Sequence, residues 1–329
     1  MPVFAEKAVK ISKLPAFRAE HFPYAGPYPW LDRPDALERI EEKLRAGEIT
    51  PDQAGQCRHW NSDGYIIVEK LFDQGTLNTV WEGYERAVRA GKIKLKAGPA
   101  PGDPHPGRYL NPHKKVGGFC RILKHTGLLN WIRLLMEREP RGLQTIAAHK
   151  GSEQPEHSDS IHMTTYPLGY LSAAWVAFED IHPDSGPLVF YPGSHRFPYI
   201  FSKDVGISVS DFKREGDRSY HEKYEPFIQN LIAQNRAQPK YFTARAGDVL
   251  IWHANLLHGG SKRQNLQLSR KSVVCHFFVK GAFVYHDLSA ARSRREEYMG
   301  TCLLRDDSGA IRGLSRFTKH KSKPNSASP

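Results

Sequence analysis

The pattern of apolar positions divides the chain into a helical first part and a strand-rich second part. Residues 35–46 carry Leu37, Ile40 and Leu44 on one helical stripe and stop before Gly47, which predicts a helix. The same reasoning predicts further helices at about 50–61, with Pro51 in the first turn, at about 75–90 and at 128–137. A strand is predicted at 65–69, after a turn at Asp63-Gly64.

Short apolar runs separated by Gly, Pro and Asp follow from Leu143 to Phe201 and return from Tyr241 to Val284. Between them, residues 208–235 form a polar insertion with helical stretches. Helices first and many short strands afterwards favour an α+β chain with a mainly β core, built as an antiparallel sandwich or barrel.

We expect a single domain over residues 1–320, with a core at about 50–285 that contains the insertion, and a disordered tail at 321–329. The first 34 residues are rich in proline and aromatics and are expected to form an arm packed on the body. Residues 97–108 are rich in glycine and proline, and structureless loops of this length often shape a site.

Composition indicates a globular protein of a reducing compartment. Hydrophobic residues make up 40% of the 329 positions, and no apolar run approaches the roughly 20 residues that a bilayer span needs. The four cysteines lie far apart and form no CxxC pair, which disfavours disulfides and a cysteine zinc site. Cys275 lies in an apolar run and is expected to be buried. The start of the chain lacks the apolar block of a secretory signal, so we expect a cytoplasmic protein.

The chain is basic, with 47 Lys and Arg against 35 Asp and Glu and a formal net charge of +12. Such an excess attracts anions of many kinds, including nucleic acid, anionic lipid, phosphates and carboxylates, and does not choose among them. A solvated basic surface explains the charge equally well.

The residues that suggest chemistry are His157-Ser158-Asp159 and His258-Gly259-Gly260. Positions two apart on a strand point to the same side, so His157 and Asp159 can reach one ion. With His258 they would form the 2-His-1-carboxylate set that binds ferrous iron on one face. Arg270, twelve residues further on, could hold the far carboxylate of 2-oxoglutarate through a two-pronged hydrogen bond.

The spacing alone leaves alternatives open. The chain has sixteen histidines, and a second triplet of this kind occurs at His182-Pro183-Asp184. We interpret that triplet as a turn, because Asp184-Ser185-Gly186-Pro187 has turn chemistry. His253 competes with His258 as a ligand, and a hydrogen-bonded core histidine is the other interpretation of it.

Several motifs occur together in one order. They are Asn61-Ser62-Asp63-Gly64-Tyr65, then Trp175-Val176-Ala177-Phe178-Glu179-Asp180, Ser185-Gly186-Pro187, Pro192-Gly193-Ser194-His195, Gly247-Asp248-Val249, Trp252-His253, His258-Gly259 and Ser269-Arg270-Lys271. In this order and spacing, over about residues 50–280, the chain resembles the phytanoyl-CoA dioxygenase family of iron(II)/2-oxoglutarate oxygenases.

The resemblance implies a double-stranded β-helix, the jelly-roll or cupin-like fold, with flanking N-terminal helices. It assigns His157, Asp159 and His258 to iron and Arg270 to the C5 carboxylate of 2-oxoglutarate. It also implies that Trp175 lies beside the cosubstrate and that Gln144 faces the pocket, with Lys114 or Lys115 as weaker candidates for holding the cosubstrate. The chain departs from the family at Gly260, where relatives often carry serine, and at Pro155-Glu156, where some carry an aromatic residue.

The implied activity uses iron(II), 2-oxoglutarate and O₂ to hydroxylate an unactivated C–H bond, with release of succinate and CO₂. Retention of Asp159 favours oxygenation over halogenation, since halogenating relatives have a small residue there. The basic excess favours a small anionic substrate: a carrier thioester, a carboxylate, or an acidic or lipid-linked sugar.

Two other classes of function remain as alternatives. One is a catalytically silent jelly-roll that binds a ligand. The other is a nucleic-acid-binding protein, which we do not expect because aromatic residues are not interleaved with the basic ones. A lipid-linked substrate would favour peripheral contact between the Arg-rich C-terminal region and an anionic inner membrane face.

Overall fold

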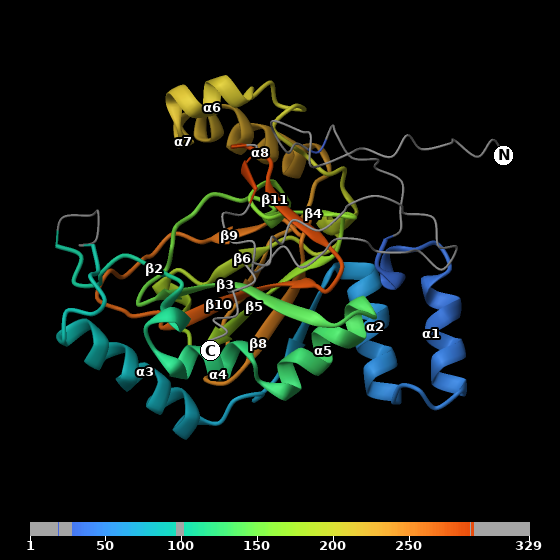
Figure 1. The fold of residues 1–329 in the computed structure, drawn as a ribbon, viewed down its shortest axis with the longest axis horizontal. Helices are drawn as coiled ribbons and strands as arrows, with labels where there is room; N and C mark the ends of the chain where they lie inside the picture. Colours follow the sequence, from blue (N-terminus) through green and yellow to red (C-terminus); the bar gives the residue numbers. More distant parts are fainter. Residues whose placement is uncertain (1–18, 20–27, 97–101, 290, 293–329) are drawn as a thin grey trace, which may run out of the picture.

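A six-stranded antiparallel sheet forms the centre of the molecule (Figure 1). The computed structural model describes residues 19, 28–96, 102–289 and 291–292, so the expected disordered tail and most of the expected N-terminal arm lie outside the described residues. In spatial order the strands are β1 (Tyr65–Val68), β8 (Val249–His253), β5 (Leu171–Ala177), β10 (Ser272–Val279), β3 (Pro140–Ala148) and β2 (Tyr109–Leu110).

Two smaller antiparallel sheets complete the β structure. One has the order β7 (Lys240–Phe242), β6 (Leu188–Phe190) and β9 (His258–Gly260). The other has the order β12 (Ala291–Arg292), β11 (Phe283–His286) and β4 (Thr164–Tyr166). The connections between the sheets include the short helices η5 (Asp159–Ile161) and η6 (Pro183–Ser185), and η7 (Ser194–Arg196) follows β6.

The large sheet is buried on both faces, as β5 shows best. All seven residues of β5 are buried. Trp175 points inward and packs in one apolar cluster with Leu188 and Phe242 of the small β6–β7–β9 sheet. Ala174 and Val176 point outward into a second cluster shared with the helices. This double burial explains why β5 is an almost unbroken apolar run instead of an alternating one.

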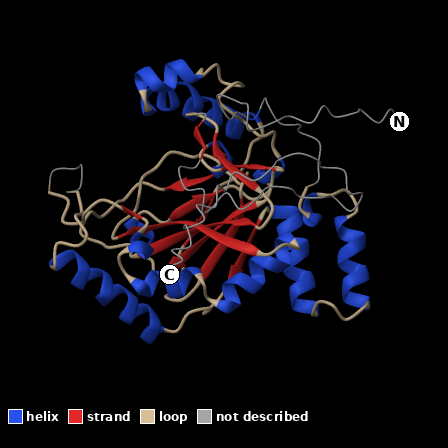
Figure 2. Ribbon diagram, in the orientation of Figure 1, coloured by secondary structure: helices blue, strands red, loops and turns tan. Residues whose placement is uncertain are grey.

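Helices cover the outer face of the large sheet (Figure 2). They are α1 (Ala36–Arg45), α2 (Pro51–Asp63), α3 (Gln74–Arg89), α4 (Gly117–Leu123) and α5 (Thr126–Met136), joined by the short helices η3 (Trp30–Asp32) and η4 (Pro112–Lys114). The fold is therefore a double-stranded β-helix with flanking helices, as predicted. None of the described helices is long and apolar enough to cross a membrane.

The four helices and the first strand that the pattern predicted are confirmed to within about two residues. Helix α4 was not predicted, because it opens on two glycines, which are poor helix formers. Its stability comes from packing, since Phe119 and Ile122 are buried in the cluster beneath the sheet.

Three further sequence interpretations are confirmed. The triplet at His182 begins the short turn η6, where His182 Nδ1 accepts a hydrogen bond from the Asp184 backbone N–H at 3.1 Å. His253 is a core histidine, 2% exposed, with its Nε2 3.0 Å from Asp32 Oδ2. Cys275 is buried, and this burial raises the pKa of its thiol.

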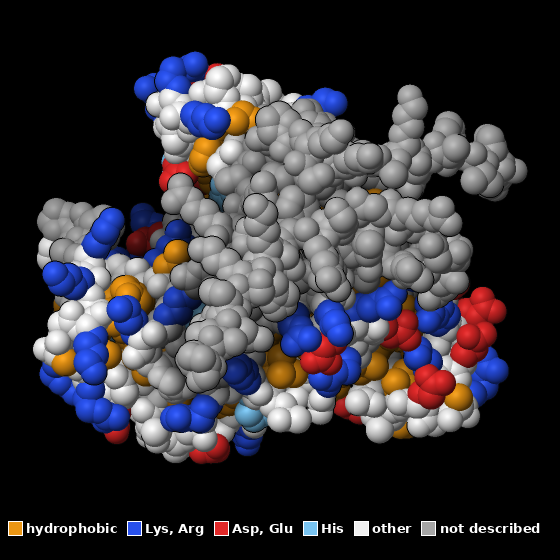
Figure 3. Space-filling view, viewed as in Figure 1, with side chains coloured by type: hydrophobic (Ala, Val, Ile, Leu, Met, Phe, Trp, Pro, Cys, Tyr) orange, Lys and Arg blue, Asp and Glu red, His pale blue; other side chains and the backbone are white. Residues whose placement is uncertain are grey.

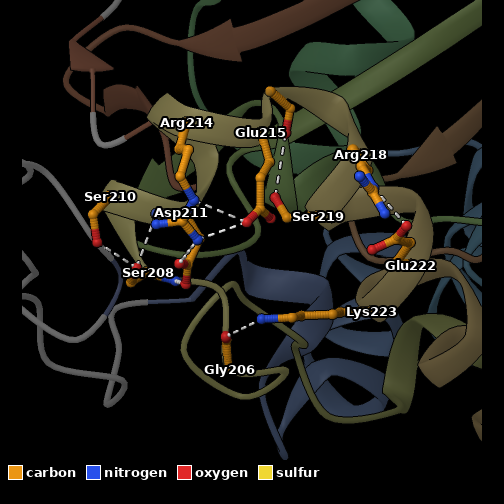
Figure 4. A network of polar contacts seen from close by, with 11 residues as sticks. Gly206, Ser208, Ser210, Asp211, Arg214, Glu215, Arg218, Ser219, Glu222 and Lys223 are labelled. Atoms are coloured by element: carbon orange, nitrogen blue, oxygen red, sulfur yellow. Dashed lines mark hydrogen bonds and ion pairs between the residues drawn. The ribbon is translucent and has the colours of Figure 1, made fainter.

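The insertion lies on the far side of the β structure from α3, α4 and α5 (Figure 1). It consists of α6 (Val209–Glu215), α7 (Asp217–Ser219), the π-helix η8 (Tyr220–Tyr224) and α8 (Glu225–Gln234). Its outer side carries local polar contacts, including a capping box between Ser208 and Asp211 and the Arg218–Glu222 pair (Figure 4). Exposed pairs of this kind add little stability, so Tyr220 and Tyr224, buried against the β structure, provide the main attachment.

Burial keeps several histidines of this fold neutral. Desolvation lowers the pKa of His149 to about 4 and the pKa values of His157, His162 and His195 to about 3. An exposed histidine in the unfolded chain titrates near its ordinary pKa of about 6.5. Between pH 6.5 and about 4, the unfolded chain therefore binds protons that the folded chain does not.

We predict that the free energy of unfolding falls between pH 7 and pH 5, by at most about 2 kcal/mol for each of these histidines. Urea unfolding at several pH values measures it. Replacing His195 by glutamine, which does not titrate, is expected to reduce the fall in the free energy of unfolding by the contribution of one histidine. A stability that is constant or rises on acidification would contradict the prediction.

Candidate metal centre

Three side chains of the expected metal site converge in the structure. Candidate ligand atoms of His157, Asp159 and His258 all lie within 4.8 Å of one another, and the three residues are only 3–6% exposed. His157 and His258 are joined by two backbone hydrogen bonds of 2.9 and 3.0 Å. Ser158 has extended backbone angles, which brings the side chains of His157 and Asp159 to the same side.

Main-chain carbonyls orient both imidazoles. His157 Nδ1 lies 2.9 Å from the carbonyl oxygen of Pro155, and His258 Nδ1 lies 2.9 Å from that of Leu256. Because a carbonyl only accepts, each Nδ1 must carry the proton, which leaves Nε2 unprotonated as the ligand atom; Nε2 of His157 lies 3.3 Å from the amide Nε2 of Gln154. Both Nε2 atoms are therefore prepared to bind a metal ion.

Three side chains surround the carboxylate of Asp159. Trp252 donates its indole N–H to Asp159 Oδ2 at 2.9 Å. His276 Nε2 lies 3.6 Å and His258 Nε2 3.8 Å from Asp159 Oδ1. Burial acts to raise the pKa of Asp159, but His258 and His276 outweigh it, so the pKa is lowered and the group stays ionised.

The insertion reaches the same site through its π-helix. The hydroxyl of Tyr224 lies 3.4 Å from the backbone N and 3.3 Å from Oγ of Ser158, the residue between two of the candidate ligands. Tyr220 packs its ring 4.9 Å from the ring of His162, which in turn lies 6.0 Å from that of His157. Rings from the insertion thus form part of the surroundings of the centre.

Arg270 is a buried cation without a carboxylate. It is 4% exposed, its Nη1 donates to the carbonyl oxygen of Gly186 at 2.8 Å, and its guanidinium lies 5.6 Å from the ring centre of Trp175. Its Nε has no partner, and no ion pair of Arg270 occurs among the described residues. Desolvation lowers its pKa to about 10, so the group remains charged at neutral pH. A buried charge of this kind calls for an anionic ligand.

Gly186 beside Arg270 cannot carry a side chain. Its φ is +76°, and a Cβ there would lie 2.7 Å from the Arg263 side chain. This close packing accounts for glycine in the Ser185-Gly186-Pro187 turn.

The remaining predicted positions divide into two groups. Gln144 pairs directly with His276 across β3 and β10, and paired residues point to one face, so Gln144 shares the face that carries His276. Lys114 and Lys115, in contrast, are exposed on and just after η4.

The two departures from the family pattern have structural explanations. A Cβ at Gly260 would lie 2.3 Å from Oγ of Ser152, so Ser152 takes the space that a side chain at 260 would need. Glu156 faces the insertion, where its carboxylate accepts hydrogen bonds from Tyr191, at 3.0 Å, and from Gln229 of α8.

Sequence reasoning missed His276, the contact of Trp252 with Asp159, and the role of Tyr224. A signal existed for His276, since it is a single imidazole in the apolar run of β10. The other two contacts join residues 93 and 66 positions apart, and no local pattern encodes them.

The chain is 29% identical over 133 residues to the peroxisomal phytanoyl-CoA dioxygenase of Rattus norvegicus, a match to 39% of this chain and about a third (34%) of that protein. It is 25% identical over 243 residues to the ectoine dioxygenase of Bordetella bronchiseptica, covering 70% of this chain and 78% of the relative.

Solved structures share the fold. EctD from S. alaskensis with bound Fe has a TM-score of 0.56 at 18% identity, covering 74% of this chain and 82% of EctD. The 2-oxoglutarate-dependent carbocyclase SnoK from nogalamycin biosynthesis has a TM-score of 0.55 at 14% identity, over 73% and 88% of the two chains. The family model for phytanoyl-CoA dioxygenase (PhyH) matches residues 60–272, well over half of the chain. The protein therefore belongs to the phytanoyl-CoA dioxygenase family of iron(II)/2-oxoglutarate-dependent oxygenases.

Proposed function

We propose that this protein is an iron(II)/2-oxoglutarate-dependent dioxygenase that hydroxylates an unactivated C–H bond of a small anionic substrate. The observation that carries the proposal is the convergence of His157, Asp159 and His258 at one buried point. Two imidazoles and one carboxylate on one face of an ion are the donor set that non-haem iron(II) oxygenases use.

The residues present fit both groups. His157 and His258 would offer Nε2 and Asp159 a carboxylate oxygen to iron(II). Arg270, buried with an unpartnered Nε, would receive the C5 carboxylate of 2-oxoglutarate beside Trp175. When bound, the iron and its oxo acid supply, with O₂, the oxidising power for C–H hydroxylation and release succinate and CO₂.

The protein's own contribution is positioning and exclusion of water. Carbonyl oxygens hold His157 and His258 in one tautomer, and Trp252 fixes the orientation of Asp159. Burial of the three ligands lowers the local dielectric, which strengthens their hold on a cation.

The substrate class is inferred from charge. The net charge of +12 supports an anionic substrate such as a carrier thioester, a carboxylate, or an acidic or lipid-linked sugar. The relatives are named for phytanoyl-CoA and for ectoine, so family membership alone does not select one. The free cysteines Cys57 and Cys275, both buried, support a cytoplasmic location.

A catalytically silent ligand-binding protein is the alternative. It would lack selection for a complete metal site and for a cosubstrate cation. The joint retention of His157, Asp159, His258 and Arg270 therefore favours the enzyme.

We predict that anaerobic addition of iron(II) and 2-oxoglutarate produces the weak visible band, near about 500 nm, of a chelated iron(II)–oxo acid complex. His157→Ala should abolish the band. Arg270→Ala should weaken 2-oxoglutarate binding by about tenfold to a hundredfold, because it removes a charge-assisted contact. Correctly folded protein that gives no band would overturn the enzyme proposal and favour the silent alternative.

We also predict that Trp252→Phe weakens metal binding by roughly tenfold to a hundredfold, since Asp159 loses the donor that orients it. Cobalt(II) titration measures this without turnover. Trp30→Phe is the matched control, because Trp30 is equally buried and donates its indole N–H to Leu134 at 2.8 Å in the helical layer. Equal metal affinity in the two variants would show that Trp252 does not support the site.

We further propose that the insertion closes over the pocket. The contacts of Tyr220 and Tyr224 near the metal ligands support this. Limited proteolysis should then cut residues 208–235 more slowly with metal and 2-oxoglutarate than without them. Cleavage at the same rate in both conditions would argue against a lid.

A further inference from the structure

Arg108 is an exposed cation close to the metal centre. It lies at the end of the loop that leads into β2. Its Nη1 donates to Oε1 of Gln154 at 2.7 Å, a neutral amide. Among the described residues it forms no ion pair.

Gln154 connects Arg108 to a candidate metal ligand. Its Nε2 lies 3.3 Å from His157 Nε2, the nitrogen whose lone pair faces the centre. A metal ion on that nitrogen would take the lone pair and the space in front of it, so the amide N–H₂ of Gln154 would move aside and lose its acceptor. Gln154 and Arg108 then present donors side by side at the edge of the centre.

Residues 102–108, which lead up to β2, are anchored to the body at Asp103. Asp103, whose carboxylate is fully buried, accepts hydrogen bonds from Arg263, at 2.6 and 3.2 Å, and from Lys150. These contacts, those of Arg263 first, hold the pKa of Asp103 well below its usual range. Arg263 also pairs with Glu153 at 3.1 Å, so the cations of this cluster are balanced. Arg108, at the end of the same loop, has no carboxylate partner among the described residues.

The charge balance of the centre with iron(II) and 2-oxoglutarate bound also leaves Arg108 without a counter-ion. A ferrous ion, Asp159, dianionic 2-oxoglutarate and Arg270 would together cancel. On the insertion side, the rings of Tyr220 and His162 pack 4.9 Å apart, and neither residue forms an ion pair among the described residues. Figure 3 shows that Lys and Arg side chains outnumber Asp and Glu on the side of the molecule where α3 and β2 lie. Among the described residues, Arg108 therefore remains available to pair with an anion of the substrate.

We infer that Arg108 and Gln154 form the anchor for an oxyanion of the substrate, a carboxylate or a phosphate, and so determine specificity. The inference rests on the proposed function. Arg108 would supply the charge and a planar pair of N–H donors, and Gln154, held by the hydrogen bond from Arg108 to its Oε1, would supply a further N–H.

The test uses the full chain with iron(II) and 2-oxoglutarate under anaerobic conditions. Hexanoate, hexyl phosphate and hexanamide are titrated, and perturbation of the visible band reports binding without turnover. At least one of the two anions should bind about tenfold or more tightly than hexanamide. The response to hexanoate against hexyl phosphate decides between a carboxylate and a phosphate.

Arg108→Ala should remove this preference, and Arg108→Lys should keep part of it, because a lysine retains the charge but not the planar donor pair. Both variants should bind 2-oxoglutarate as the wild type does, which also shows that they are folded. Arg196→Ala is the matched control: Arg196 is exposed and also donates to an amide oxygen, at 3.0 Å on Asn61. Its anion preference should not change.

Equal binding of hexanamide and both anions, or an unchanged preference in Arg108→Ala, would overturn the inference. Loss of 2-oxoglutarate binding in Arg108→Ala would also overturn it, by assigning Arg108 to the cosubstrate. A wild-type protein without the band would instead contradict the proposed function, and this inference with it.

Discussion

The two backbone hydrogen bonds between His157 and His258 are the constraint on which the rest of the site depends. They join a loop to β9 at the point where both imidazoles must meet. The two segments approach closely here, with Gly259 and Gly260 packed against the backbone of residues 153–156. Side chains at those glycines would separate the two segments, and with them the histidines. The ligand geometry is thus set by main-chain contacts, before any metal binds.

Around this contact, the buried charges fall into two kinds. Asp103 and Arg263 are already paired, and they fasten a loop to the body. Asp159 and Arg270 are buried without a full protein partner, at a cost that folding alone does not recover. Between these two pairs of residues, incomplete pairing marks Asp159 and Arg270, which would serve a ligand, whereas Asp103 and Arg263 serve the fold.

The sequence was informative where a pattern is local or repeats. Amphipathic spacing predicted α1 and α3. The joint order of motifs predicted the jelly-roll and identified the candidate site residues His157, Asp159, His258 and Arg270. Helix α4 was not predicted, because its stability comes from packing, which outweighs the low helix propensity of its two glycines. The contacts of His276 and Trp252 with Asp159 were not predicted, because sheet register and not closeness in sequence places these side chains beside the carboxylate.

The insertion between β6 and β7 has its own caps, its own ion pairs and its own apolar attachment (Figure 4). It therefore behaves as a module: its sequence can drift while the strands beneath it keep their register. Substitutions at the residues that face the centre, such as Tyr220 and Tyr224, are the ones that would affect the reaction. A fold arranged in this way can acquire a new substrate by altering a peripheral segment, without rebuilding the apparatus that handles oxygen.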